Sequence, residues 1–153
     1  MNLKISDFLK PESIIMEIKS KEKIAVIKEL VNHMVENKFV SDGERFLNAL
    51  AKRENLESTG IGDGIAIPHA RTDAVDDLIL AFARSPSGVD FSSIDGKPSY
   101  LIFLIASPEN KKSEYIMALA KISRLLRKDP VRRELRAAIS PKEILKIIKK
   151  NEA

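Results

Sequence analysis

Residues 58–71 read STGIGDGIAIPHAR, in which glycines at every second position precede an apolar run and a histidine that directly follows a proline. The apolar run predicts a short strand. Pro68 fixes its own φ and favours an extended residue before it, so we expect His69 to leave the end of this strand on stiff backbone. The glycines are Gly60, Gly62 and Gly64. Because glycine lacks a Cβ, they are expected to let the main chain approach whatever the histidine handles.

Other apolar segments predict further strands of one sheet. They are residues 13–18 (SIIMEI), 78–83 (LILAFA) and 100–106 (YLIFLIA). The last two are nearly continuous apolar runs, which is typical of strands covered on both faces. Residues 85–99 are rich in turn-forming residues, and we expect Gly88 and the pair Asp95-Gly96 to be turning points.

Apolar residues at helical spacing predict helices before, between and after these strands. The expected helices span residues 21–37 with Ser20 as N-cap, 42–55, 111–127, 130–138 and 141–150. Pro130 and Pro141 stand at helix starts, where a fixed φ is favourable. This order predicts an α/β sandwich with a central mixed sheet flanked by helices. The length predicts one domain, residues 1–153.

The composition excludes several kinds of chemistry. The chain has no cysteine, which rules out disulfides, thiolate nucleophiles and cysteine metal sites. No apolar run approaches the ~20 residues that cross a bilayer. The N-terminal sequence MNLKISDFLK lacks the apolar stretch of a signal peptide. We therefore expect a cytoplasmic protein without membrane insertion.

Positive charge is concentrated towards the C-terminus. Residues 121–150 contain eleven Lys or Arg and three acidic residues, whereas the whole chain has a net charge of only +4. Such a segment could attract nucleic acid, an acidic membrane surface or an acidic protein, or it could be the solvated surface of helices. No nucleic-acid-binding motif accompanies the charge, so a basic nucleic-acid-binding domain is a remote alternative.

Three chemical roles are open to His69. A metal ligand needs companions, and no other histidine or cysteine stands at ligand spacing, so no metal is expected. A general base needs a hydroxyl nucleophile, and the chain has no G-x-S-x-G motif. A nucleophile towards phosphorus needs only the lone pair of neutral imidazole. This third role agrees best with the neighbouring residues.

Those neighbours suit a phosphoryl group better than a nucleotide. Main-chain N–H groups of glycine can approach phosphoryl oxygens, and Arg53 and Arg71 could neutralise them or could be ordinary surface residues. The segment lacks the last glycine of G-x-G-x-x-G and the Lys-Ser/Thr pair of a P-loop. A phosphoprotein is therefore the expected phosphoryl source. His33 lies off the apolar face of its helix and is expected to be exposed without a role.

The longer stretch from Arg53 to Arg71, RENLESTGIGDGIAIPHAR, closely resembles the active-site block of fructose/mannitol-type enzyme IIA domains of the bacterial sugar phosphotransferase system. The resemblance extends over essentially the whole chain, including LAKISRLL at residues 119–126. It implies that Nε2 of His69 accepts a phosphoryl group from the phosphohistidine of HPr and passes it to a cysteine of an enzyme IIB. It also implies that no metal or nucleotide cofactor takes part.

The same resemblance implies roles for other residues. Arg53 corresponds to the family arginine near the phosphoryl group. Tyr115 stands where sugar-transport members carry a second histidine, and its phenol could donate a hydrogen bond but cannot carry positive charge. It could equally be a tyrosine packed at a helix start. The expected cradle for the phosphoryl group consists of Thr59, Gly60, Gly62, Gly64, Pro68 and Arg71.

Two functions are open within this family. In transport members the acceptor is an enzyme IIB. In stand-alone nitrogen-regulatory members, the phosphorylation state of the histidine instead controls binding to regulatory target proteins. Tyr115 tilts the expectation towards the regulatory or divergent members without deciding between the two.

Overall fold

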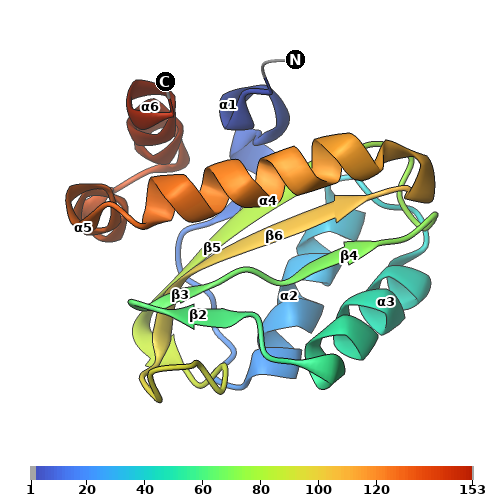
Figure 1. Ribbon diagram of the computed structural model, residues 1–153, viewed down its shortest axis with the longest axis horizontal. Coiled ribbons are helices and arrows are strands. Elements are labelled where there is room, and N and C mark those ends of the chain that lie inside the picture. Colours follow the sequence, from blue (N-terminus) through green and yellow to red (C-terminus); the bar gives the residue numbers. More distant parts are fainter. Residues whose placement is uncertain (1–2, 153) are drawn as a thin grey trace.

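The computed structural model describes residues 3–152; residues 1, 2 and 153 of the expected domain lie outside the described part. A mixed sheet lies between two layers of helices (Figure 1). The helices are α1 (Ile5–Phe8), α2 (Lys23–Glu36), α3 (Gly43–Leu56), α4 (Lys112–Leu126), α5 (Asp129–Ala137) and α6 (Pro141–Asn151), with short 3₁₀ turns η1 (Pro11–Ser13) and η2 (Glu109–Lys111). The predicted α/β sandwich with a mixed sheet is confirmed.

The sheet has the strand order β1-β5-β6-β3-β2, and β4 also pairs with β6. The strands are β1 (Ile14–Ile15), β2 (Gly60–Gly62), β3 (Ile65–Ala66), β4 (His69–Arg71), β5 (Ile79–Val89) and β6 (Ser99–Ser107). β5 and β6 form the antiparallel centre, while β1 runs parallel to β5, and β3 and β4 run parallel to β6. Strand β4, which begins at His69, is therefore paired directly with the central strand β6.

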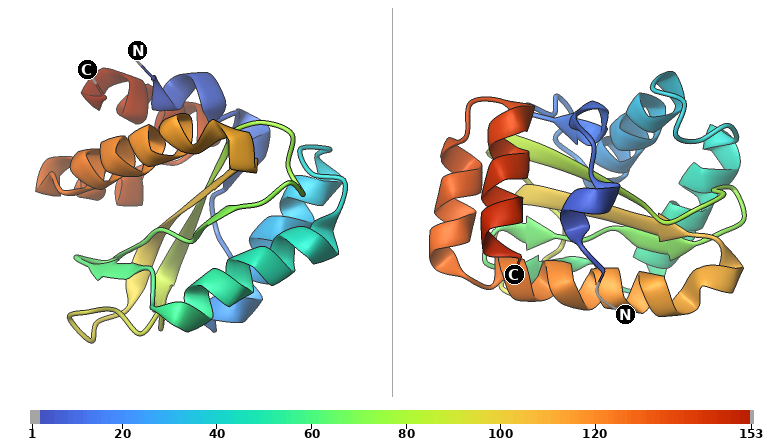
Figure 2. Two further views of the ribbon diagram at one scale, coloured as in Figure 1. Left: turned by 45° about the vertical axis from the view of Figure 1, so that its right-hand side comes forward. Right: turned by 90° about the horizontal axis from the view of Figure 1, so that it is seen from above.

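Alternate residues of β5 and β6 face two separate apolar clusters. Phe82 and Phe103 are register partners with ring centroids 5.0 Å apart, and they pack under α4, α5, α6 and α1. Their neighbours Ala83 and Ile102 belong to the cluster under α2 and α3. Figure 2 shows α1, α4, α5 and α6 gathered over one face and α2 and α3 on the other. Burial on both faces explains why these strands read as continuous apolar runs.

The first strand is shorter than predicted. Residues 13–18 were expected to be extended, but only Ile14 and Ile15 pair with β5. The chain then leaves the ladder and rejoins it where the N–H of Ile18 donates to the carbonyl of Arg84. The Ser20 N-cap is also wrong, because the Ser20 N–H and hydroxyl donate to the Glu29 carboxylate and α2 begins later, at Lys23.

One expected turn is part of a strand. Gly88 has a φ of +87° and lies within β5, where the register with β6 shifts between Arg84 and Val89. The glycine permits an irregularity in the strand instead of ending it. The turn at Asp95-Gly96 is confirmed, since the Gly96 N–H donates to the Ser93 carbonyl at 2.9 Å. Across residues 3–152, each helix is too short or too polar to traverse a lipid bilayer.

Candidate functional site

His69 begins a strand instead of ending one. The preceding strand, β3, stops at Ala66, and β4 starts at His69, which pairs in register with Ile105 of β6. The interruption falls at Ile67 and Pro68, where proline supplies no N–H for the ladder. The Pro68 carbonyl still accepts a hydrogen bond from the Ile105 N–H at 3.0 Å. The imidazole is therefore mounted on backbone bonded directly to the central strand.

One hydrogen bond orients the imidazole ring. Nδ1 of His69 lies 2.7 Å from the carbonyl oxygen of Ile67. A carbonyl oxygen only accepts hydrogen bonds, so Nδ1 carries the proton and donates it. In the neutral ring, Nε2 then holds the free lone pair. The side chain is half-buried, which leaves part of the ring open to solvent.

The surroundings keep this imidazole neutral. Burial lowers the pKa of His69 below its ordinary value; the hydrogen bond to the Ile67 carbonyl raises it, the Arg53 charge lowers it and the Glu54 charge raises it. The net effect is a lowered pKa. At neutral pH the lone pair is therefore available for attack on an electrophile.

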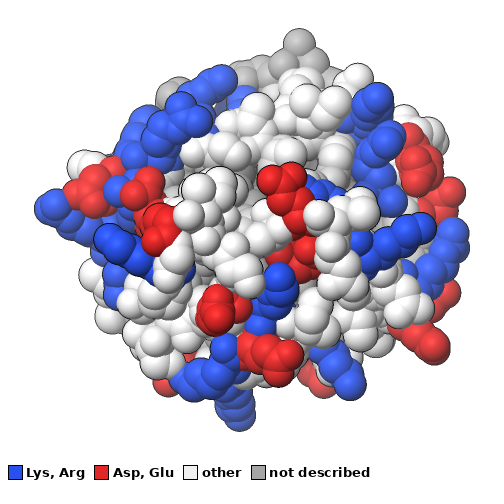
Figure 3. Space-filling model, turned by 60° about the horizontal axis from the view of Figure 1, so that its bottom comes forward, with Lys and Arg blue, Asp and Glu red and all other residues white. Residues whose placement is uncertain are grey.

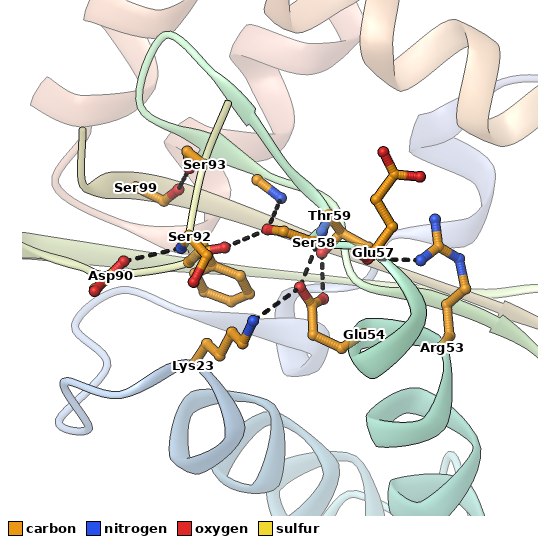
Figure 4. A network of polar contacts seen from close by, with 12 residues as sticks. Lys23, Arg53, Glu54, Glu57, Ser58, Thr59, Asp90, Ser92, Ser93 and Ser99 are labelled. Atoms are coloured by element: carbon orange, nitrogen blue, oxygen red, sulfur yellow. Dashed lines mark hydrogen bonds and ion pairs between the residues drawn. The ribbon is translucent and has the colours of Figure 1, made fainter. Parts of the chain in front are cut away.

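Two side chains from other elements, Tyr115 and Arg53, accompany His69. The Tyr115 ring, in the first turn of α4, lies with its centroid 5.9 Å from that of the imidazole. Burial raises the pKa of Tyr115, while the charges of Arg53 and Arg71 lower it, so the phenol remains a hydrogen-bond donor. The guanidinium of Arg53 donates from Nη1 to the Glu57 carbonyl at 2.8 Å, which holds this side chain at the end of α3 (Figure 4).

A shallow groove of about 450 Å³ runs beside these residues. Its lining residues are Arg45, Ala49, Lys52, Arg53, Leu56, Ala70, Arg71, Thr72, Asp73, Glu109 and Tyr115. Arg71 lies 3.8 Å from the exposed Glu109 carboxylate. Such an exposed pair is weak, so the guanidinium can turn to another anion at little cost. The structure thus brings Arg53, Arg71 and Tyr115 together around one predominantly basic groove.

The glycines serve a different part of the molecule. Gly62 and Gly64 have φ values of +92° and +78° and form the β2–β3 turn, which points away from β4 (Figure 1). A Cβ on Gly60 would lie 2.3 Å from Oγ of Ser93, and one on Gly64 would lie 3.1 Å from the Tyr100 ring. The structure therefore does not bring Gly62 and Gly64 to His69. Their small size accommodates the turn and the 91–100 segment.

Thr59 supports the site from inside the protein. It is buried, and its N–H and hydroxyl both donate to the carboxylate of Glu54, at 2.9 and 2.5 Å (Figure 4). The sequence analysis predicted no role for Glu54. A signal was present, because Phe46, Leu50 and Glu54 stand four residues apart on the inward face of α3. An acid at the next position of an apolar stripe indicates a buried carboxylate.

The other histidine has a partner. His33 was expected to be exposed, but it is partly buried, and its Nε2 lies 2.8 Å from the carbonyl oxygen of Glu12. This contact ties α2 to the turn η1. No three His, Cys, Asp or Glu side chains within the described residues gather in a way that could hold a metal ion.

The basic C-terminal charge is divided among several surfaces. On α5, Arg132 and Arg133 pair with Asp129, and Lys150 pairs with Glu134. Other cations line a hollow of about 680 Å³ between α1, α4 and α6: Lys4, Lys121, Arg124, Lys128 and Lys149. Figure 3 shows that, on the side below the sheet, Lys and Arg alternate with acidic residues and uncharged surface.

Comparison with known proteins shows the family of the chain. Residues 7–151 match the family model described as "Phosphoenolpyruvate-dependent sugar phosphotransferase system, EIIA 2". The chain belongs to this family of phosphotransferase-system EIIA domains. Phosphoryl transfer is the role that the family shares.

Relatives of both functional branches are similar to the chain. It is 39% identical over 150 residues to the "PTS system fructose-specific EIIABC component" of Bacillus subtilis, covering 98% of the chain but only 24% of that longer protein. It is 34% identical to a "Nitrogen regulatory protein" of Bradyrhizobium diazoefficiens, with 94% of both chains covered. The crystal structure of the nitrogen regulatory protein IIA-Ntr from Neisseria meningitidis has a TM-score of 0.86 at 30% identity and covers 94% of this chain and 98% of that one.

Proposed function

We propose that the chain is a phosphocarrier in which Nε2 of His69 accepts a phosphoryl group from the phosphohistidine of HPr and passes it to a cysteine of an enzyme IIB. The observation that carries this proposal is the bond from Nδ1 to the Ile67 carbonyl, because it leaves the Nε2 lone pair free. In the first step the Nε2–P bond forms as the N–P bond of the donor histidine breaks. The donor ring, protonated at its other nitrogen, leaves as neutral imidazole, and no proton needs to leave Nε2. In the second step the cysteine thiolate forms an S–P bond as the Nε2–P bond breaks, and His69, still protonated at Nδ1, is again neutral.

The groove supplies the charge that such a transfer needs. Phosphoryl transfer depends on positioning and on neutralising the equatorial oxygens. Arg53 provides positive charge beside the imidazole and Arg71 provides it beside Tyr115, whose phenol can donate a hydrogen bond to a phosphoryl oxygen. Of the other residues of the expected cradle, Thr59 and Pro68 act by holding the backbone of His69.

The exposed surface suits a macromolecular donor. Leu56 lines the groove and is 79% exposed, and Ile116, the neighbour of Tyr115 on α4, is 51% exposed. Apolar side chains beside a half-buried imidazole favour docking of a protein over capture of a small phosphate ester. This agrees with phospho-HPr as the donor.

The alternative function is regulation, in which phosphorylation of His69 controls binding to a target protein. The phosphoryl group would add about two negative charges to this apolar and basic surface, enough to strengthen or abolish docking. Tyr115, in the place where sugar-transport members of the family carry a second histidine, favours this alternative. Both functions share phosphorylation of His69 and differ in the fate of the phosphoryl group.

Reconstitution tests the shared step. The protein is incubated with phosphoenolpyruvate, enzyme I and HPr, and intact mass is measured for wild type, His69→Ala and His33→Ala. We expect one acid-labile, alkali-stable phosphoryl group on wild type and on His33→Ala and none on His69→Ala. Labelling that survives His69→Ala would overturn the proposal. Adding an enzyme IIB then separates the branches, because a carrier loses its phosphoryl group to the IIB cysteine and a regulatory switch retains it.

A further inference from the structure

Glu54 is a buried carboxylate within the apolar face of α3. It is 2% exposed, and both carboxylate oxygens accept hydrogen bonds from Thr59. Its cationic neighbour is Lys23, whose Nζ lies 3.8 Å from Oε2. Burial of a carboxylate is costly unless its oxygens are satisfied, and an apolar residue would fit the stripe formed with Phe46 and Leu50. The carboxylate therefore calls for an explanation beyond packing.

A continuous chain of hydrogen bonds leads from this carboxylate to the imidazole. Glu54 holds the N–H and hydroxyl of Thr59. The Thr59 carbonyl accepts from the Ile67 N–H at 2.9 Å. The Ile67 carbonyl in turn accepts from Nδ1 of His69 at 2.7 Å. Glu54 thus fixes the peptide segment whose carbonyl selects the tautomer of the histidine, although it does not touch the ring in this chain of bonds.

We propose that Glu54 is a positioning residue for phosphoryl transfer at His69, acting through Thr59 and Ile67 to keep the proton on Nδ1 and the lone pair on Nε2. This inference rests on the proposed function. A carboxylate suits the role because it only accepts hydrogen bonds and has one oxygen for each Thr59 donor. A glutamine would turn its NH₂ group towards one of those donors.

The charge of Glu54 adds a second effect. When Nε2 attacks phosphorus, electron density leaves the ring and the Nδ1-protonated imidazole acquires imidazolium character. The buried negative charge of Glu54 stabilises positive charge on the ring. The positive charge of Arg53 destabilises it but stabilises the negative charge of the phosphoryl oxygens. Two consecutive residues at the end of α3 thereby stabilise the opposite charges that develop on the ring and on the phosphoryl group.

The test compares Glu54→Gln with Glu57→Gln, which removes an exposed carboxylate three residues further on. Single-turnover phosphorylation by phospho-HPr is measured, and NMR of the His69 ring nitrogens reports tautomer and titration. We expect Glu54→Gln to slow phosphorylation by up to about a hundredfold, as displacement of a reacting group does, to mix the tautomers and to lower the pKa of His69. Glu57→Gln should leave the rate and the tautomer as in wild type. Thr59→Ser should keep the wild-type phosphorylation rate and the wild-type tautomer, whereas Thr59→Val should slow phosphorylation and mix the tautomers.

The outcomes separate positioning from simple stability. If Glu54→Gln lowers Tm but leaves the tautomer, the titration and the rate per folded molecule unchanged, Glu54 is structural and the inference is wrong. Should Glu54→Gln fail to fold, the Thr59→Val and Thr59→Ser pair decides by the same readouts. The ring NMR uses unphosphorylated protein, so it tests the positioning role even if phospho-HPr does not label wild type, which would instead refute the proposed function.

Discussion

The carbonyl oxygen of Ile67 lies 2.7 Å from Nδ1 of His69, so a residue only two positions earlier determines which ring nitrogen carries the proton. This short-range contact is possible because Pro68 separates β3 from β4 and turns the Ile67 carbonyl out of the sheet ladder. The tautomer of the histidine is therefore set by the Ile-Pro-His backbone. Glu54 and Thr59 stabilise the position of that backbone through their hydrogen bonds.

The first prediction concerns pH. Because burial lowers the pKa of His69, the fraction of neutral imidazole should persist below its ordinary midpoint of about 6.5. Phosphorylation by phospho-HPr should therefore fall only at lower pH, after correction for titration of HPr. An NMR titration of His69 gives the midpoint directly, and a midpoint above the ordinary value would contradict the prediction.

The same shift affects stability. The folded state binds a proton at His69 less readily than the unfolded state does, so this residue's contribution to the free energy of unfolding is present above the unfolded pKa and is lost as pH falls through the folded pKa. Denaturant unfolding of wild type and His69→Gln between pH 8 and about 5 measures it. The wild type should lose more stability over this range, and parallel curves would count against a lowered pKa.

Arg53 should act on the reaction more than on the fold. Arg53→Gln removes the charge that lies beside both His69 and Tyr115, and it should slow phosphorylation about a hundredfold, the usual effect of losing one transition-state donor. Arg45→Gln is the matched control, since Arg45 lines the same groove but is not among the charges that shift the pKa of His69. Equal slowing by the two substitutions would show that only the general charge of the groove matters.

Substitutions of Tyr115 distinguish a hydrogen-bonding role of its hydroxyl from a packing role of its ring. Tyr115→Phe retains the ring beside His69 and removes the hydroxyl, so a donor role predicts a slowing of about three- to tenfold, equivalent to one modest hydrogen bond. Tyr115→His restores a side chain that can carry positive charge and should speed transfer to an enzyme IIB. Unchanged rates in both variants would mean that Tyr115 serves only packing.

Gly60 should be required for stability more than for chemistry. A Cβ at this position would lie 2.3 Å from Oγ of Ser93 and 3.1 Å from the Ser93 Cα, so Gly60→Ala should cost about 1–3 kcal/mol as an overpacked site does. Gly96→Ala is the comparison, because a Cβ there would meet no atom within 4 Å and only the φ of +70° opposes the change. If Gly60→Ala abolishes phosphorylation without loss of stability, the glycine acts in the phosphoryl cradle instead.

Much of this protein is determined by local patterns in the sequence. The runs 78–83 and 100–106 predicted strands buried on both faces, and the structure places them as neighbours at the centre of the sheet. Helical spacing located α2 to α6 to within about two residues, a normal uncertainty for helix ends. The block from Arg53 to Arg71 indicated the family and selected His69. Such features depend on residues close together in the chain, so they can be seen in the sequence.

Only the tertiary structure decided which contacts the folded backbone makes. Gly88 looked like a turn residue, but pairing with β6 extends β5 through it. The spacing of Gly60, Gly62 and Gly64 suggested a ligand cradle, whereas the steric need for small residues comes from Ser93, Asp95 and Tyr100. Glu54, Thr59, Ile67 and His69 are linked by hydrogen bonds because the β2–β3 hairpin brings Ile67 back to Thr59, just after the end of α3. Hydrogen bonds and steric limits of these kinds exist only once the backbone has taken its folded path, which is why the tautomer and support of His69 had to be learned from the structure.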